Sequence, residues 1–244
     1  MAKLEPMDPG RVRFADIESR RRFTRGLFDS SAQDYDRVDR LLALGSGTWY
    51  RRQALLRAGL APGMRMLDVA VGTGLVALEA VRIVGAAGFV AGVDPSEGMT
   101  ARIAGRGLAV VRGRAEALPL ASASFDFLCL GYALRHLADL EAAFGEFRRV
   151  LRPGGRVLLL EITRPEGRVA SALLKAYLRG VLPWLARAVA RNRNTPALYR
   201  YYWDSIEACV PPARIMASMA AAGFGAVARG VQLGIFSEYC ASAA

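Results

Sequence analysis

Residues 66–74, with the sequence MLDVAVGTG, form an apolar run that ends in a glycine-bearing turn, and a helical pattern over residues 75–84 follows directly. A second apolar run, residues 89–94, ends in Asp94. Glycines in such a turn let the backbone approach a ligand, and a carboxylate at the end of the second strand can accept both hydroxyls of a ribose. The pairing therefore predicts a nucleoside site at the edge of a parallel sheet.

The charge around the turn indicates which nucleoside would bind. A dinucleotide fingerprint reads G-x-G-x-x-G and places a pyrophosphate on the helix N-terminus, whereas this turn, residues 70–74, reads AVGTG and follows Asp68. An acid at that place repels a pyrophosphate and suits an ammonium group. S-adenosylmethionine (SAM) carries an amino group, a sulfonium and no phosphate, so the pattern favours SAM over NAD. A glycine turn alone also fits a purely structural strand-to-helix connection.

Strand-like and helix-like runs alternate through the main part of the chain. Helical patterns begin near Gly74, Ser96, Asp139 and Pro212, and a turn at residues 152–155 leads into the fifth strand. Alternation of this kind predicts an α/β fold with a mostly parallel sheet covered by helices on both faces. The seven expected strands are residues 64–70, 89–94, 108–112, 125–130, 156–162, 226–230 and 232–239.

Two helical segments lie outside this pattern. Residues 1–60 are predicted to form a helical cap, including a helix at 36–43, and residues 61–244 to form the core. An insertion at residues 165–205, rich in leucine and aromatic residues, is predicted to form a substrate lid that Pro183 breaks. Its apolar stripe also fits an ordinary pair of core helices. The arginines between its aromatic residues fit contact with a membrane surface.

The composition limits the class of protein. A chain of 244 residues with 53% hydrophobic residues is long enough for one domain with a full core. No apolar run approaches the roughly 20 residues that span a bilayer, and residues 1–6 lack the apolar core of a signal peptide. We therefore expect a cytoplasmic protein. Cys129, Cys209 and Cys240 lack metal-ligand spacing, so free thiols and no metal site are predicted.

The net charge of +11 comes almost entirely from arginine, because Lys3 and Lys175 are the only lysines. Such an excess attracts nucleic acid or an anionic membrane surface. The arginines are scattered singly among alanines and leucines, however, and no nucleic-acid-binding motif accompanies them. The pattern favours a solvated arginine-rich surface and no nucleic-acid partner.

Several short motifs occur along the chain in a fixed order. They are Tyr35-Asp36, residues 67–74, residues 115–119, residues 132–136 (YALRH), residues 149–155 (RVLRPGG), Leu160-Glu161, residues 199–201, Ser205-Ile206 and residues 222–224. In this order they resemble the class I SAM-dependent methyltransferases and, more specifically, the C-methyltransferase family of ubiquinone and menaquinone biosynthesis. The resemblance implies a Rossmann-like seven-stranded sheet, SAM as the cofactor and a small aromatic acceptor. The expected acceptor atom is a ring carbon of a quinol or phenol, with or without a prenyl tail.

The resemblance also implies the cofactor site. The expected cofactor-binding residues are Asp68, Ala70, Gly72, Thr73, Gly74, Asp94, Pro95, Met99, Ala115 and Glu116. Two of these residues have an alternative role. Asp94 can cap the helix that begins after Pro95, and Glu116 can cap a loop instead of contacting the adenine.

Departures from the family pattern concern the acceptor more than the cofactor. Leu75 replaces a usual aspartate, Arg114 replaces Asn or Asp at the position that contacts the adenine, and no histidine stands near Gly47. Residues 210–212 and 236–239 also differ from the usual sequences. These changes keep open O- or N-methylation in a specialised pathway, or a binding protein that has kept the fold without catalysis.

Methylation of a ring carbon requires that a neighbouring hydroxyl first loses its proton, so the site needs a base or a cation near that hydroxyl. His136 is the only histidine and can accept a proton near neutrality. The resemblance implicates Arg135, whose permanent charge can stabilise a phenolate. The alternatives are a capping role for His136 near Asp139 and a surface salt bridge for Arg135. Tyr35 closes over the cofactor or anchors a cap helix.

The sequence leads to expectations about partners and location. A hydrophobic, prenylated acceptor predicts peripheral contact of the protein with the inner face of the membrane. A homodimer is also allowed by these expectations.

Overall fold

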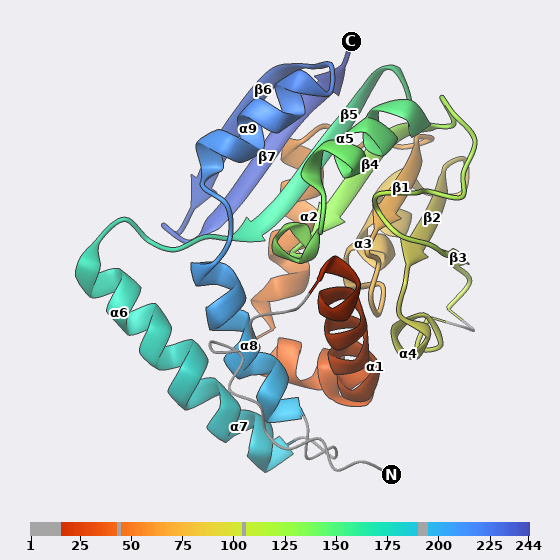
Figure 1. The fold of residues 1–244 in the computed structure, drawn as a ribbon. Helices are drawn as coiled ribbons and strands as arrows, with labels where there is room; N and C mark the ends of the chain where they lie inside the picture. Colours follow the sequence, from red (N-terminus) through yellow and green to blue (C-terminus); the bar gives the residue numbers. More distant parts are fainter. Residues whose placement is uncertain (1–15, 43–44, 104–105, 190–194) are drawn as a thin grey trace.

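The computed structural model describes residues 16–42, 45–103, 106–189 and 195–244. In this part of the chain seven strands form one sheet in the order β3-β2-β1-β4-β5-β7-β6 (Figure 1). The strands are β1 (Arg65–Val69), β2 (Phe89–Asp94), β3 (Ala109–Arg112), β4 (Phe125–Gly131), β5 (Leu151–Ile162), β6 (Phe224–Gln232) and β7 (Phe236–Ala243). All neighbours pair in parallel except β7, which runs antiparallel to β5 and β6. The predicted α/β, Rossmann-like, mostly parallel sheet is confirmed.

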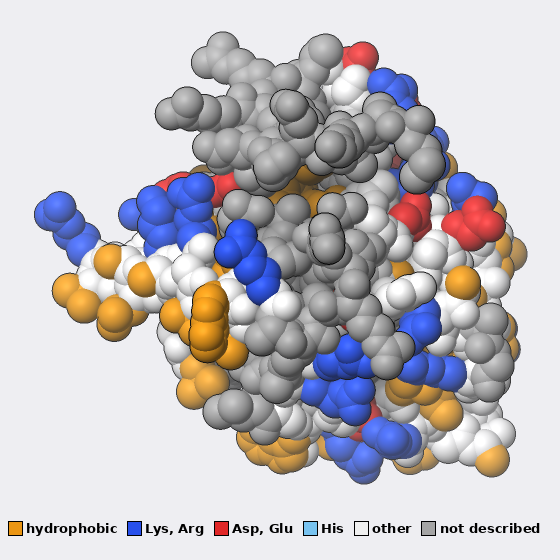
Figure 2. All heavy atoms as spheres, turned by 90° about the horizontal axis from the view of Figure 1, so that it is seen from below, with side chains coloured by type: hydrophobic (Ala, Val, Ile, Leu, Met, Phe, Trp, Pro, Cys, Tyr) orange, Lys and Arg blue, Asp and Glu red, His pale blue; other side chains and the backbone are white. Residues whose placement is uncertain are grey.

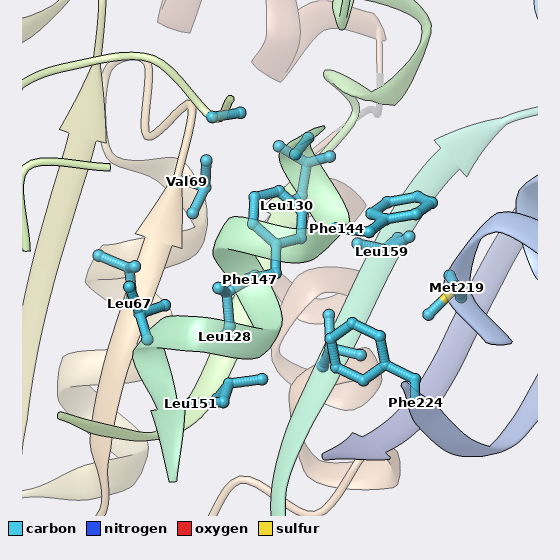
Figure 3. Packing of buried hydrophobic residues seen from close by; sticks show 14 of the residues in the cluster. Leu67, Val69, Leu128, Leu130, Phe144, Phe147, Leu151, Leu159, Met219 and Phe224 are labelled. Atoms are coloured by element: carbon cyan, nitrogen blue, oxygen red, sulfur yellow. The ribbon is translucent and has the colours of Figure 1, made fainter. Parts of the chain in front are cut away.

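Helices cover both faces of the sheet because successive side chains of a strand point to opposite faces. Leu67 on one face of β1 belongs to a core cluster that includes α5 (Leu140–Val150) and α9 (Pro212–Ala221). Met66 on the other face packs in a cluster with α2 (Ser46–Arg57) and α3 (Leu75–Val84). Figure 3 shows Phe144 and Phe147 of α5 among the leucines of β4 and β5.

The largest differences from the predicted strand boundaries are at the start of β5 and in the hairpin between β6 and β7. β5 starts at Leu151 and continues through the expected turn, with a register shift opposite residues 125–127 of β4 and Gly154 at φ +74°. The last hairpin turns at Leu233 and Gly234, both with positive φ, so the strand predicted at 232–239 was wrong and β7 begins at Phe236. The periodic pattern could not place this turn because Gly230 offered a competing turn residue four positions earlier.

The helical segments lie beyond the C-terminal ends of the parallel strands (Figure 1). α1 (Ile17–Leu42) is much longer than the helix predicted at 36–43. It packs with α8 (Thr195–Glu207) and with Leu178 and Leu182 of the lid around one further apolar cluster. α2 packs on the sheet, whereas α1 packs on the lid; the division of the chain at residue 60 stays a prediction.

Pro183 does not break the lid helix, which corrects the prediction. α6 (Arg168–Ala176), a π-helical turn η2 (Tyr177–Val181) and α7 (Leu182–Val189) follow one another without a gap. A proline has no N–H and its ring collides with the carbonyl four residues earlier. The wider π turn immediately before Pro183 accommodates both effects, so residues 168–189 form one continuous helical run.

Candidate functional site

A cavity of about 330 Å³ opens at the C-terminal ends of β1 to β4. Backbone and side chains from these strand ends form one wall, and α1 forms the other. Nine predicted residues line it: Tyr35, Ala70, Gly72, Asp94, Pro95, Met99, Ala115, Glu116 and His136. Four predicted residues lie outside the lining: Asp68, Thr73, Gly74 and Arg135. The described residues contain no cluster of His, Cys, Asp and Glu that could hold a metal ion.

The turn after β1 has left-handed backbone at both of its glycines and at the residue that begins it. Ala70, Gly72 and Gly74 all have positive φ, of 54°, 56° and 88°. Gly74 is the N-cap of α3, and its N–H donates to the carbonyl of Val71 at 2.9 Å. Left-handed backbone costs roughly 1 kcal/mol or more in a residue such as Ala70. The strained residue and the glycine turn both border the cavity, where backbone must come close to a ligand.

Asp94 is held in place by two backbone donors. Its Oδ2 accepts from the N–H of Gly72 at 2.8 Å, and its Oδ1 accepts from the N–H of Ser96 at 2.8 Å. Burial raises the pKa of Asp94 to about 6, against the opposing effect of these hydrogen bonds. Each carboxylate oxygen keeps a further lone pair for a ligand hydroxyl. The N-cap of α4 (Glu97–Thr100) is Ser96, so the capping role considered for Asp94 is filled by another residue.

Asp68 lies beneath the turn and not in the cavity wall. Burial raises its pKa to about 8, and the backbone N–H of Ala77 in α3 opposes that rise. The other carboxylate oxygen, Oδ2, is buried without a hydrogen-bond partner in the described structure, as is the hydroxyl of Thr73. Asp68 therefore stabilises the turn and the start of α3 from beneath. The direct contact with an ammonium group that the sequence suggested is not part of this geometry.

Glu116 connects three segments at the edge of the cavity. Its Oε1 accepts from the N–H of Ala138 at 3.0 Å and from Arg21 of α1 at 3.5 Å. These contacts are those of a residue that caps a loop, which is the alternative role considered for Glu116. Arg114, the unusual residue of this loop, also lines the cavity and forms an isolated bridge with Ala117.

His136 lines the cavity and contacts Tyr201 of the lid. Its Nδ1 lies 3.1 Å from the hydroxyl of Tyr201, and the two rings stack with centroids 5.5 Å apart. Nε2 is buried and has no hydrogen-bond partner among the described residues. Burial lowers the pKa of His136 well below 6.5, and the charges of Arg135 and Arg20 lower it further. The imidazole is therefore neutral at neutral pH, and a cap at Asp139 is not its role because Asp139 caps α5 itself.

Arg135 is buried and does not line the cavity, which corrects the surface salt bridge considered for it, and any effect of its charge on an acceptor is exerted through space. Its guanidinium forms an ion pair with the buried Glu161 and donates to the hydroxyl of Ser205 at 3.1 Å. It also donates to the carbonyl of Tyr132 at 2.8 Å and lies over the ring of Tyr202 at 5.0 Å. These contacts fix the segment that carries His136, so we assign Arg135 a positioning role and no direct contact with an acceptor.

The buried ion pair gives a test of stability. We expect Arg135→Met to lower the free energy of unfolding by about 3–5 kcal/mol, because Glu161 is left charged and unpaired in the interior. The double variant Arg135→Met/Glu161→Gln is expected to recover part of this loss, since no charge remains to be desolvated. Denaturant unfolding measures both. The control is Arg214→Met, whose ion pair with Glu141 is solvent-exposed and worth about 0–1 kcal/mol; equal losses at the two sites would contradict the assignment.

Tyr35 anchors α1 to the lid, and its closing over the cofactor stays a prediction. It lines the cavity, and its hydroxyl accepts from the hydroxyl of Tyr202 at 3.2 Å. Burial raises its pKa, so the phenol stays protonated. Tyr35 thus connects α1, the lid and the cavity wall.

Among the residues of the cavity and its surroundings that were not predicted from the sequence, Phe28, Tyr132 and Tyr201 each had a recognisable sequence signal. Phe28 lines the cavity from α1. Its sequence signal is the helical spacing of Phe23, Leu27 and Phe28 within a segment that also contains glycine and serine. Tyr132 lines the cavity with φ +59°, a strained value inside the YALRH motif. Tyr201 was assigned to the lid, although its hydroxyl contacts His136.

Comparison with known proteins identifies the family of this chain. A model of the ubiE/COQ5 methyltransferase family matches residues 15–240. The demethylmenaquinone methyltransferase of Mycobacterium sp. (strain KMS) is 36% identical over 201 residues, covering 82% of this chain and 85% of that protein. The protein of the same name from Mycolicibacterium paratuberculosis is 34% identical over 213 residues, covering 87% and 90%.

Solved structures share the fold. A possible histamine N-methyltransferase from Thermotoga maritima aligns with a TM-score of 0.63 at 23% identity, over 90% of this chain and 99% of that one. A SAM-dependent methyltransferase from Aquifex aeolicus aligns with a TM-score of 0.58 at 20% identity, over 80% and 89%. At these identities the likeness establishes the fold alone. The match of the family model over nearly the whole described chain, together with the curated relatives, shows that this chain belongs to the ubiE/COQ5 methyltransferase family.

Proposed function

We propose that this chain transfers a methyl group from SAM to a ring carbon of a demethylated quinol of the menaquinone type. The proposal is supported most directly by one cavity whose lining includes both Asp94 and His136, the imidazole of which keeps an unpartnered Nε2 among the described residues. The curated relatives carry the name demethylmenaquinone methyltransferase, which points to the acceptor class.

The residues of the cavity fit the nucleoside part of SAM. The Asp94 carboxylate, held by Gly72 and Ser96, faces the cavity with lone pairs for the two ribose hydroxyls. Met99 and Ala115 are apolar and buried at the same wall, which suits the faces of an adenine. The buried carboxyl of Asp68 supports the turn from beneath, and burial raises its pKa to about 8, so its negative charge is present only at alkaline pH. These residues would hold the donor, and the donor, when bound, supplies the methyl group.

His136 prepares the acceptor in this proposal. Nε2 takes the proton of a ring hydroxyl, the O–H bond breaks, and its electron pair spreads into the ring as far as the ortho carbon. For Nε2 to act as the acceptor, Nδ1 must carry the other proton and donate it to the hydroxyl of Tyr201. The charges of Arg135 and Arg20, which disfavour an imidazolium, favour the phenolate beside it. The remaining task of the chain is to align the two reactants and exclude water.

The acceptor's chemistry implies where the chain works. A quinol with a prenyl tail is dissolved in a bilayer, so we propose that the chain takes it at the inner face of a membrane. Among the helices that the structure describes, none combines the length and the apolarity needed for a membrane span.

A direct assay tests the function. The purified chain is incubated with SAM and a reduced, demethylated naphthoquinol that carries a short prenyl tail, and the products are analysed by mass spectrometry. We expect a gain of one CH₂ that fragmentation assigns to the ring. A gain assigned to an oxygen would indicate O-methylation instead, and the absence of any gain despite tight SAM binding would indicate a binding protein without catalysis.

A further inference from the structure

The helical run of residues 168–189 exposes a stripe of large apolar side chains. Val169 is 74% exposed, Leu173 67%, Val181 48% and Trp184 66%. Residues three or four apart lie on one face of a helix, so Val169 and Leu173 share a face, and Trp184 follows Val181 three residues later. In Figure 2 the arm that projects at the left, where α6 lies, carries orange side chains along its edge beside blue ones.

The opposite face of the same run already has its partners. Leu178 and Leu182 are buried in the cluster that α1 and α8 share, and Leu174 packs against that cluster. Packing within the chain therefore explains one face of the run and leaves the exposed stripe unexplained. Large exposed apolar patches on a soluble domain are typical of interaction surfaces.

The charges beside the stripe are of one sign. Arg168, Lys175, Arg179 and Arg187 are exposed on the run, and residues 168–189 contain no acid. Arg179 forms an ion pair with Asp204 of α8 at 3.9 Å, and Lys175 lies over the ring of Trp203 at 5.8 Å. An apolar face with a tryptophan and a basic flank is the pattern of a helix that lies in the plane of a membrane interface.

We propose that residues 168–189 dock in the plane of an anionic lipid bilayer, with Val169, Leu173, Val181 and Trp184 inserted among the acyl chains. Charge complementarity favours this occupant over a second copy of the chain. The net charge of +11 makes two copies repel, whereas anionic headgroups attract the same arginines. This inference deepens the proposed function, because it names the surface at which a prenylated acceptor would be collected.

The buried face of the run packs in a cluster that extends to the lining of the cavity. Leu178 and Leu182 belong to the same apolar cluster as Tyr201, and Phe28 and Tyr35 pack against that cluster. Phe28 and Tyr35 also line the cavity, and Tyr201 contacts His136. The run is thus connected to the cavity through one apolar cluster of packed side chains.

Tryptophan fluorescence reports the docking directly. Of the three tryptophans, Trp49 is 64% exposed, Trp184 is 66% exposed and Trp203 is buried. In the variant Trp49→Phe, Trp184 is therefore the remaining exposed tryptophan. We expect its emission to shift to shorter wavelength, and brominated acyl chains to quench it, with vesicles that contain phosphatidylglycerol and phosphatidylcholine in equal parts. Phosphatidylcholine alone should produce a much smaller change, and high salt should weaken the effect.

Two matched pairs of variants locate the surface. Leu173→Glu is expected to weaken vesicle affinity by roughly tenfold to a hundredfold, since a buried leucine contributes about 1.5–3 kcal/mol and each 1.4 kcal/mol is a factor of ten. Leu233→Glu, in the β6–β7 turn where Leu233 is 85% exposed, should leave it unchanged. Trp184→Ala should weaken binding roughly tenfold and Trp49→Ala should not. Unchanged thermal unfolding would confirm that the variants fold.

Three outcomes would overturn the proposal. One is the absence of vesicle binding, and another is an equal loss in both members of a pair. The third is a dimer in ultracentrifugation that Leu173→Glu dissociates, which would assign the stripe to a second copy. The binding mixture contains neither cofactor nor acceptor, so these outcomes leave the proposed methyl transfer standing.

Discussion

Asp94→Asn is expected to weaken the binding of SAM and of S-adenosylhomocysteine by roughly a hundredfold to a thousandfold. A hydrogen bond to a charged group contributes about 1.5–3 kcal/mol, and Asp94 offers the carboxylate for two ribose hydroxyls. The asparagine has one acceptor oxygen and one donor group, yet the N–H groups of Gly72 and Ser96 both point at this side chain. The NH2 group of the asparagine would then face one of these two backbone N–H groups in a buried site, and the two donors would repel each other. Titration calorimetry with both ligands measures the loss.

The matched control for this change is Asp126→Asn. Asp126 is also an acid on a parallel strand, but it lies near the start of β4, at the end of the sheet away from the cavity, where it pairs with Arg152 at 2.6 Å. Its replacement should leave cofactor affinity unchanged. Should Asp94→Asn bind SAM as tightly as the unaltered chain does, the ribose role of Asp94 would have to be abandoned.

The same carboxyl predicts a pH dependence of cofactor binding. Burial raises the pKa of Asp94 to about 6 in the ligand-free chain, and donation from ribose hydroxyls favours the charged form. Affinity should therefore fall as the pH is lowered through 6, because a proton must leave Asp94 before the ligand binds, and level off above it. In Asp94→Asn this fall should disappear. A rise that remains near pH 8 would come from Asp68, whose pKa burial raises to about 8.

The succession of strands and helices along the chain could be predicted from the sequence because it depends on local patterns. The apolar runs at β1, β2 and β4 are each short and bounded by turn residues, and parallel strands bring their carboxyl ends to one edge. Asp94 and Gly72 therefore had to lie near each other. The last two strands were misplaced because either Gly230 or Gly234 could form the turn, and pairing with β5 decides between them.

The roles of Asp68 and Arg135 could not be predicted because they depend on which way a side chain points. Strand alternation buries Asp68 under the turn, where helix α3 covers it. Arg135 follows the cavity-lining Tyr132 by only three residues, but the 3-10 turn at Leu134–His136 sends neighbouring side chains in different directions. Arg135 then meets Glu161 of β5, a partner 26 residues away that no local pattern connects to it. Its neighbour His136 points into the cavity.

His136→Gln is expected to lower kcat by roughly a hundredfold or more while the affinity for SAM stays within about threefold, since a general base contributes 10²–10⁴-fold to the rate. The glutamine retains polarity at the position and removes the basic nitrogen. Tyr201→Phe should lower kcat by a smaller factor, about tenfold, because the ring stack remains while the hydroxyl that fixes the imidazole is lost. Steady-state rates with a short-tailed quinol, at saturating SAM, measure both variants.

The pH profile distinguishes a base from a merely structural histidine. Burial and the charges of Arg135 and Arg20 hold the pKa of His136 well below 6.5, so the base stays neutral to a lower pH than an ordinary histidine does. With SAM saturating, kcat should stay level from neutral pH down to about pH 6, where an ordinary histidine of pKa about 6.5 would be mostly protonated. The decrease in kcat should appear only at lower pH, and it should be absent from the residual kcat of His136→Gln. A kcat in that variant within about threefold of the unaltered rate, or a decrease that survives the substitution, would remove His136 from the chemistry and leave it as a packing partner of Tyr201.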